Sequence, residues 1–152
     1  MKTAAFAISI LFVAVSAFAH VTVAPQQSGQ GATQIYKVRV HNEEKIATTS
    51  IELDIPEGVT VTSVAPVAGG KSSSAKSGDR IVKITWDTEV PPAKYVELAF
   101  TAKNPATATS IQWNVHQHMA DGKVIEWSDK AGAHGKPSLT KIVATTPAPA
   151  AK

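Results

Sequence analysis

The chain has 152 residues, of which 43% are hydrophobic and 18% are charged, and its formal net charge at pH 7 is +3. This length suits one domain with its own core and is too short for two ordinary domains. The lysines are scattered and not interleaved with aromatic residues, which argues against a nucleic-acid-binding surface. The chain has no cysteine, so its stability must come from core burial and hydrogen bonding.

Residues 1–19 have the pattern of a secretory signal peptide. Lys2 provides the positive start, an almost unbroken apolar run covers Ala4–Phe18, and a small-x-small cleavage pattern ends at Ala19. The run is shorter than the about 20 apolar residues that span a bilayer. We therefore expect cleavage after Ala19, which leaves His20 as the first residue of a periplasmic or secreted protein without a transmembrane anchor.

Five segments alternate apolar and polar side chains with the period of two that indicates half-buried strands. Their apolar residues are Tyr36, Val38 and Val40; Ile51, Leu53 and Ile55; Val82, Ile84 and Trp86; Val96, Leu98 and Phe100; and Ile111, Trp113 and Val115. Turn residues separate the segments, and Asp121-Gly122 is a strong hairpin signal. Because no segment has a sustained helical period, we predict an all-β fold of about seven to nine short strands. The spacing favours an antiparallel β-sandwich of immunoglobulin or cupredoxin type.

Two further segments lack this alternation. We interpret residues 68–78, which are rich in glycine, serine and lysine, as a flexible surface loop, because they lack the spacing of a phosphate-binding loop. Residues 144–152 form a Pro/Ala tail that we expect to be disordered. The predicted organisation is a cleaved signal peptide over 1–19, one β-sandwich domain over 20–143, and this tail.

An amino-terminal histidine offers two nitrogen ligands from a single residue. The α-amine has a reference pKa of about 7.7 to 8.0, and it can chelate a metal together with the imidazole Nδ1. Nitrogen ligands in a planar arrangement suit Cu(II), which also stands at the top of the divalent affinity order. His20 is therefore a candidate copper ligand, and the alternative is that a histidine follows the cleavage site by chance. In the precursor the nitrogen of His20 is an amide, so only processing would create the site.

The other histidines are weaker candidates. His41 and Glu43 share one face of an extended backbone and could converge on a site, or they could form an ordinary charged junction between a strand and a turn. His116 and His118 likewise share a face and could bind one metal, although a solvated polar face is the blander interpretation. His134 lies in a predicted loop.

The remaining chemistry is sparse. Trp86 and Trp113 are expected in the core, as is Trp127, which follows Glu126 near a sheet end and could also line a pocket. Without cysteine or a Gly-x-Ser-x-Gly motif there is no support for nucleophilic catalysis. We therefore do not expect an enzyme.

Four segments, taken in order, carry a family resemblance. They are His20-Val21-Thr22-Val23 with Pro25, Asn42-Glu43 before Ala47-Thr48-Thr49, Phe100-Thr101-Ala102-Lys103-Asn104-Pro105, and Asp121-Gly122 before Glu126-Trp127. Together they resemble the YcnI-type copper-binding domain. The resemblance implies a periplasmic or extracellular β-sandwich that binds Cu(II) through a monohistidine brace. In that site His20 supplies both nitrogens, Glu43 the carboxylate, and Trp127 lies close to the metal. Glu44 takes the place of Glu43 if the turn is shifted by one residue.

Two departures from the family pattern affect what can be carried over. His41 stands where the family tends to have proline, which adds a possible second imidazole near the metal. Ala68-Gly69-Gly70 replaces a Pro-Gly-Trp-like segment, and this should alter a loop more than the site. Some relatives carry a membrane-spanning tail, which we do not expect in this protein.

The resemblance and the ligand types together favour a function in copper trafficking, acquisition or homeostasis. After processing the chain has no cysteine and only Met119 as a thioether, so its ligands suit Cu(II) better than Cu(I). The expected partners are the copper ion and other periplasmic copper-handling proteins or a membrane copper transporter, with no nucleic acid. One alternative is a copper oxygenase of the polysaccharide monooxygenase type, which needs a second histidine. Another is a metal-free immunoglobulin-like interaction module.

Overall fold

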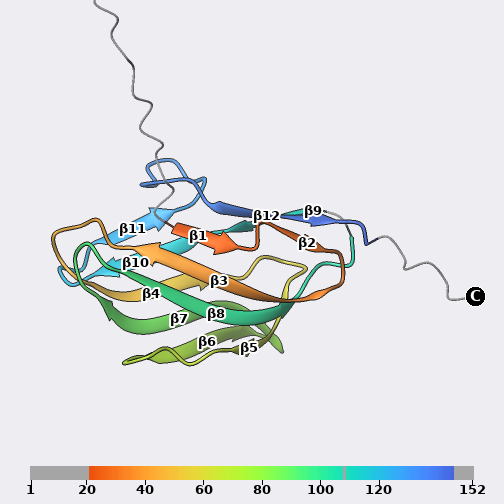
Figure 1. Cartoon of the computed structure of the whole chain (residues 1–152), viewed down its shortest axis with the longest axis horizontal. Helices are drawn as coiled ribbons and strands as arrows, with labels where there is room; N and C mark the ends of the chain where they lie inside the picture. The colour runs from red at the N-terminus through yellow and green to blue at the C-terminus, as the bar shows by residue number, and fades with distance from the viewer. Residues whose placement is uncertain (1–20, 108, 146–152) are drawn as a thin grey trace, which may run out of the picture.

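The computed structural model describes residues 21–107 and 109–145, and every regular element among them is a β-strand (Figure 1). The predicted signal peptide over 1–19, His20 and most of the predicted tail lie outside the described residues. No helix among the described residues is long and apolar enough to cross a membrane.

The strands form three sheets. The four-stranded sheet has the order β1-β3-β8-β5, with bounds Val21–Ala24, Thr33–His41, Tyr95–Lys103 and Thr60–Val64. The five-stranded sheet has the order β11-β10-β4-β7-β6, with bounds Val124–Trp127, Val115–Met119, Thr48–Asp54, Arg80–Val90 and Lys71–Ser77. The three-stranded sheet has the order β2-β12-β9, with bounds Gln27–Gly29, Ser138–Val143 and Thr109–Trp113. All pairs are antiparallel except β2 with β12.

The core lies between the sheets and contains all of the predicted alternating residues except Val82 and Val96, which are partly buried. Tyr36 and Phe100 of the four-stranded sheet stack with ring centroids 5.4 Å apart. Phe100 reaches Trp86 of the five-stranded sheet at 6.4 Å, and Tyr36 reaches Trp113 of β9 at 4.9 Å. Trp86 and Trp113 are fully buried, so the prediction that they are core aromatics is confirmed. Side chains of all three sheets therefore meet in one aromatic cluster, as expected when sheets pack face to face.

A buried polar network holds the end of β8 to the start of β3. The Tyr36 hydroxyl donates to Asn104 Oδ1 at 2.6 Å, and Asn104 Nδ2 donates to Ser28 Oγ and the Gly29 carbonyl at 2.8 and 2.7 Å. Burial of the Tyr36 hydroxyl raises its pKa to about 12, against the smaller opposing effects of its hydrogen bonds to Ser28 and Asn104. Asn104 thus has a structural role, since its buried amide is fully hydrogen-bonded.

The structure corrects two predictions about the elements. The described residues contain twelve strands rather than seven to nine, partly because one long run breaks at Asn114 into β9 and β10, which join different sheets. Residues 71–77, predicted as part of a flexible loop, form β6 and pair with β7 from Lys71↔Asp87 to Ser77↔Arg80. Every residue of β6 is exposed. Since neither face is buried, its sequence shows no apolar alternation.

Candidate metal centre

The start of β1 is fixed beside the end of β3. Val21 pairs with Val40 and Val23 with Val38, and all four side chains are buried. The β-branched residues favour the strands, and the buried faces fix their register, because a slip by one residue would expose the valines. The first described residue of β1 therefore lies next to the strand end that carries His41.

His41 and Glu43 lie together at that strand end. His41 is the last residue of β3, and its Nδ1 is 3.6 Å from Oε1 of Glu43. Their side chains are 41% and 49% exposed, so solvent and solutes reach both. This proximity fits both alternatives, an ordinary charged junction between a strand and a turn and a part of a metal site. Glu44 instead lies near Lys123, with Oε2 3.9 Å from Nζ.

Asn42, between these two residues, was not predicted to have a role of its own. Its fully buried amide Nδ2 donates to the carbonyls of Ile46 and Val90, both at 2.8 Å, and its Oδ1 accepts from the backbone N–H of Glu44 at 3.0 Å. These bonds fix the turn that presents Glu43. The local part is an Asx-type turn that the Asn-x-x sequence could have suggested, whereas the bond to Val90 is long-range.

Trp127 ends β11 and is 5% exposed, which confirms that it is a core aromatic. The residue forms a parallel bridge with Gly135, and its ring lies 5.2 Å from that of His134 in an edge-to-face arrangement. Three residues after Gly135, Ser138 Oγ accepts from the N–H of Val23 at 2.9 Å. The chain following Trp127 therefore leads directly to the outer edge of β1, and Figure 1 shows β11 ending on the side of the molecule where β1 begins.

The described residues alone do not complete a metal site. In residues 21–107 and 109–145, no group of three or more His, Cys, Asp or Glu side chains could hold a metal ion. The predicted nitrogen donor His20 lies outside the described residues. A metal at this strand end would need ligands in addition to His41 and Glu43, and an amino-terminal chelate is chemically suited to supply them.

His116 and His118 lie on the outer face of β10, where carboxylates surround them. His116 Nε2 bonds to Asp54 Oδ2 at 2.8 Å, and its Nδ1 is 3.5 Å from Glu126 Oε1. His118 Nε2 lies 3.5 Å from Glu52 Oε2. The nitrogens of His116 point to different carboxylates rather than converging with His118 on one point. The interpretation as a polar outer face therefore fits better than a metal site shared by the two histidines.

Lys83 completes this outer face. Its Nζ lies 3.0 Å from Glu52 Oε2 and 3.9 Å from Asp54 Oδ1. Burial alone would raise the pKa of Glu52, but the hydrogen bond and charge of Lys83, with His118, outweigh it and lower the pKa. The hydrogen bond to Glu52 raises the pKa of Lys83. The outer face of β4, β7 and β10 thus carries a group of oppositely charged side chains within ion-pair distance of one another.

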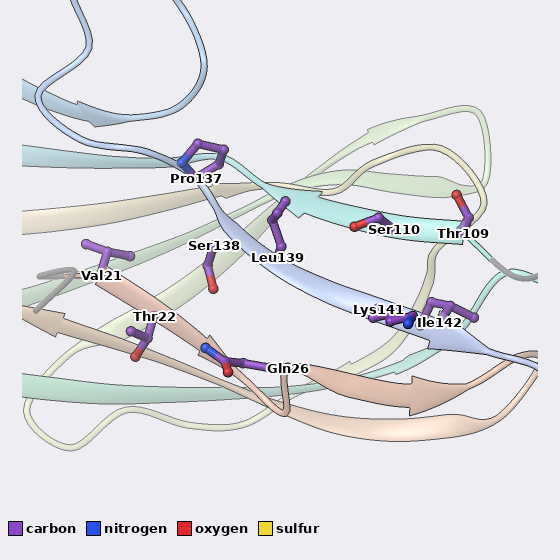
Figure 2. Close-up of a pocket in the computed structure, with 10 residues that line it drawn as sticks. All are labelled: Val21, Thr22, Gln26, Thr109, Ser110, Pro137, Ser138, Leu139, Lys141 and Ile142. Atoms are coloured by element: carbon purple, nitrogen blue, oxygen red, sulfur yellow. The ribbon is translucent and has the colours of Figure 1, made fainter.

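A groove of about 790 Å³ opens on the outer side of β1 and is a poor metal site. Figure 2 shows its lining from β1, β9 and β12, including Val21, Thr22, Ser138 and Leu139. Lys141 is the one charged residue among those that line it, so the lining offers no carboxylate or imidazole. The candidate centre is the His41–Glu43 end of β3 and not this groove.

Comparison with known proteins agrees with the fold. A non-cellulosomal cohesin from Archaeoglobus fulgidus gives a TM-score of 0.51 at 14% identity, covering 82% of this chain and 90% of the cohesin. An uncharacterized protein from Nocardia farcinica, described as having an immunoglobulin-like fold, gives a TM-score of 0.70 at 21% identity, covering 83% and 99% of the two chains. The predicted immunoglobulin-like β-sandwich is confirmed.

Sequence comparison identifies the family. The chain is 33% identical over 137 residues to the copper-binding protein CutI of Bacillus subtilis (strain 168). The aligned region covers 88% of this chain and 67% of CutI. Residues 20–152 match the family described as "Domain of unknown function (DUF1775)". The chain therefore belongs to the DUF1775 family, and the predicted YcnI-like relationship is confirmed.

Proposed function

We propose that the processed protein binds one Cu(II) at the junction of β1 and β3 and acts in copper trafficking, acquisition or homeostasis. The observation that carries this proposal is the register Val21↔Val40 beside the His41–Glu43 pair. Continued by one position, this antiparallel register would set an amino-terminal His20 beside His41, close to the Glu43 carboxylate. The relationship to a copper-binding protein supports copper as the metal.

The donor set fits Cu(II). The His20 amine and imidazole would supply two nitrogens and Glu43 an oxygen, the ligand types that Cu(II) accepts in planar arrangements. Cu(I) prefers thiolate and thioether sulfur, but the sulfur of Met119 is in the core, where it accepts a hydrogen bond from Thr48 Oγ1 at 3.6 Å and the residue is 2% exposed. No accessible sulfur ligand is found among the described residues.

Export creates the site in this proposal. The nitrogen of His20 becomes a free amine only after cleavage behind Ala19, so the precursor cannot assemble the brace inside the cell. The match to the family begins at residue 20, which supports this boundary. The protein would then exchange copper in the periplasm or outside the cell with other copper-handling proteins or a membrane copper transporter.

A matched pair of variants tests the carboxylate ligand. We expect Glu43→Gln to weaken Cu(II) binding about tenfold or more, because the ligand charge is lost. Glu44→Gln should change the affinity by less than about threefold, since Glu44 faces Lys123. The measurement is a competition titration of the processed protein against a chelator of known affinity. If only Glu44→Gln weakened Cu(II) binding, the ligand would be Glu44 and not Glu43. If neither variant changed the affinity, a carboxylate ligand would be contradicted.

A further inference from the structure

Residues 128–135, which we call the Trp127 loop, follow β11 and fold back onto its end. The backbone N–H groups of His134 and Gly135 both donate to the carbonyl of Glu126, at 2.9 and 3.3 Å. The N–H of Ser128 donates to the carbonyl of Gly135 at 3.1 Å. The two ends of the loop are therefore held together beside Trp127.

Two residues of the Trp127 loop contact the indole itself. The His134 ring meets it edge to face, with centroids 5.2 Å apart and planes inclined by 69°. At Gly135 the backbone approaches so closely that an added Cβ would overlap Cε3 and Cζ3 of Trp127. Only glycine allows this approach, so the indole is held between the backbone at Gly135 and the imidazole of His134.

The surroundings leave the loop room to move. A cavity of about 350 Å³ lies between β11 and the loop, lined by residues that include Glu126, Ala131, Gly132 and His134. His134 itself is exposed. Besides the bond between Ser128 and Gly135, the hydrogen bonds inside the loop run from the N–H of Ala133 to the Lys130 carbonyl and from that of Lys130 to Ser128 Oγ, at 3.2 and 3.3 Å. Short segments with few buried contacts open at low free-energy cost.

We propose that the Trp127 loop regulates copper exchange by holding the indole over the metal, with His134 and Gly135 as positioning residues. The proposal rests on the proposed function and on the expectation, from the family resemblance, that Trp127 lies close to the bound Cu(II); the return of the chain after Trp127 to the outer edge of β1 agrees with that expectation. A held indole limits the access of water and competing ligands to the metal. When the loop releases the indole, copper should enter and leave faster while the ligands stay the same.

The first part of the test uses the copper-free, processed protein. In His134→Ala, the resonance of the Trp127 indole N–H should shift, and its proton should exchange with solvent faster than in wild type. This resonance is assigned by its loss in Trp127→Phe. His134→Phe should restore the wild-type behaviour, because an aromatic edge is kept. Lys136→Ala, an exposed neighbour of Gly135, is the control and should change neither quantity.

The second part measures the rate at which the copper-loaded protein gives Cu(II) to a chelator in stopped flow. His134→Ala should release copper about three- to tenfold faster than wild type, the range that corresponds to loss of one aromatic contact. The number of nitrogens seen by electron paramagnetic resonance should not change. Equal release rates in wild type and His134→Ala would overturn the regulation, and an unchanged indole resonance would overturn the holding role. A wild-type protein that binds no copper would instead contradict the proposed function, whatever the indole resonance shows.

Discussion

At the scale of single residues, Asn42 holds the turn that carries the candidate ligand Glu43. Its amide links the carbonyls of Ile46 and Val90 on two sides of the turn that presents Glu43. A buried carbonyl that loses its donor costs about 1 to 3 kcal/mol. The position of Glu43 therefore depends on a residue that contacts no metal.

Asn42→Ala should lower the free energy of unfolding by about 2 to 4 kcal/mol, since the buried Val90 carbonyl and the partly buried Ile46 carbonyl lose their donor. The measurement is equilibrium unfolding in urea, and the Cu(II) affinity should fall in the same variant because the Glu43 turn loosens. Gln112→Ala is the control, because it removes an amide whose one bond, to Asn114 at 3.3 Å, is partly exposed. An Asn42→Ala protein as stable as Gln112→Ala would contradict the role of Asn42.

At the residue scale, the sequence could suggest only short-range neighbours. His41 Nδ1 and Glu43 Oε1 do lie 3.6 Å apart, but Glu43 lies beyond the end of β3, in the turn held by Asn42, and strand alternation does not place it. Three other contacts join residues that lie 7 to 79 positions apart in the sequence: Glu44 with Lys123, Asn42 with Val90, and Trp127 with His134. Period and propensity carry no information about such pairs.

At the scale of elements, β6 is an edge strand whose sequence does not resemble a strand. Its serines and lysines are exposed on both faces, a composition that also discourages pairing with other chains. Alternation reveals half-buried strands, so it found the core strands and missed this one. Directly before β6, Gly70 allows the close approach of the backbone to β7, since an added Cβ would overlap the Asp87 carbonyl oxygen.

Gly70→Ala should therefore destabilise the protein by about 1 to 3 kcal/mol, since the new methyl group also meets Thr88 Cβ and Val67 Cγ1 at 3.0 Å. Ser73→Ala within the exposed strand should change the stability by less than about 0.5 kcal/mol. Urea unfolding midpoints of the two variants provide the comparison. Equal midpoints would mean that residues 68–78 are as loosely held as the sequence alone suggested.

From the ion pairs on the outer face of β4 and β7, we predict that the stability of the protein depends on pH. The pKa of Glu52 is lowered in the folded protein, so its stabilising effect is present above the unfolded pKa of about 4.3. It is lost as the pH falls through the folded value. Glu52→Gln should lose less stability than wild type between about pH 6 and pH 3. Glu97→Gln is the control, because its Lys37–Glu97 pair is exposed to solvent, and an identical acid response of Glu52→Gln and wild type would contradict the coupling.

At the scale of the whole molecule, the β-sandwich brings an amino-terminal strand and two distant segments to one side. β1 is an edge strand of its sheet, so its first residue adjoins the end of β3, and the chain after Trp127 returns to the outer edge of β1. The fold class followed from period-two patterning and turn residues. The proposed metal-binding role could not follow from patterning, because in the proposal it depends on a terminal amine that only processing would create.

The central claim is that the free amine of His20 binds Cu(II), and a titration of two processed proteins tests it most directly. One protein begins at His20, and the other carries a single alanine before it, which turns the amine of His20 into an amide but leaves the described sandwich intact. We predict one Cu(II) per chain for the first protein and an affinity at least about tenfold weaker for the second, with equal thermal stability of the copper-free forms. Equal copper affinity in the two proteins would contradict the brace.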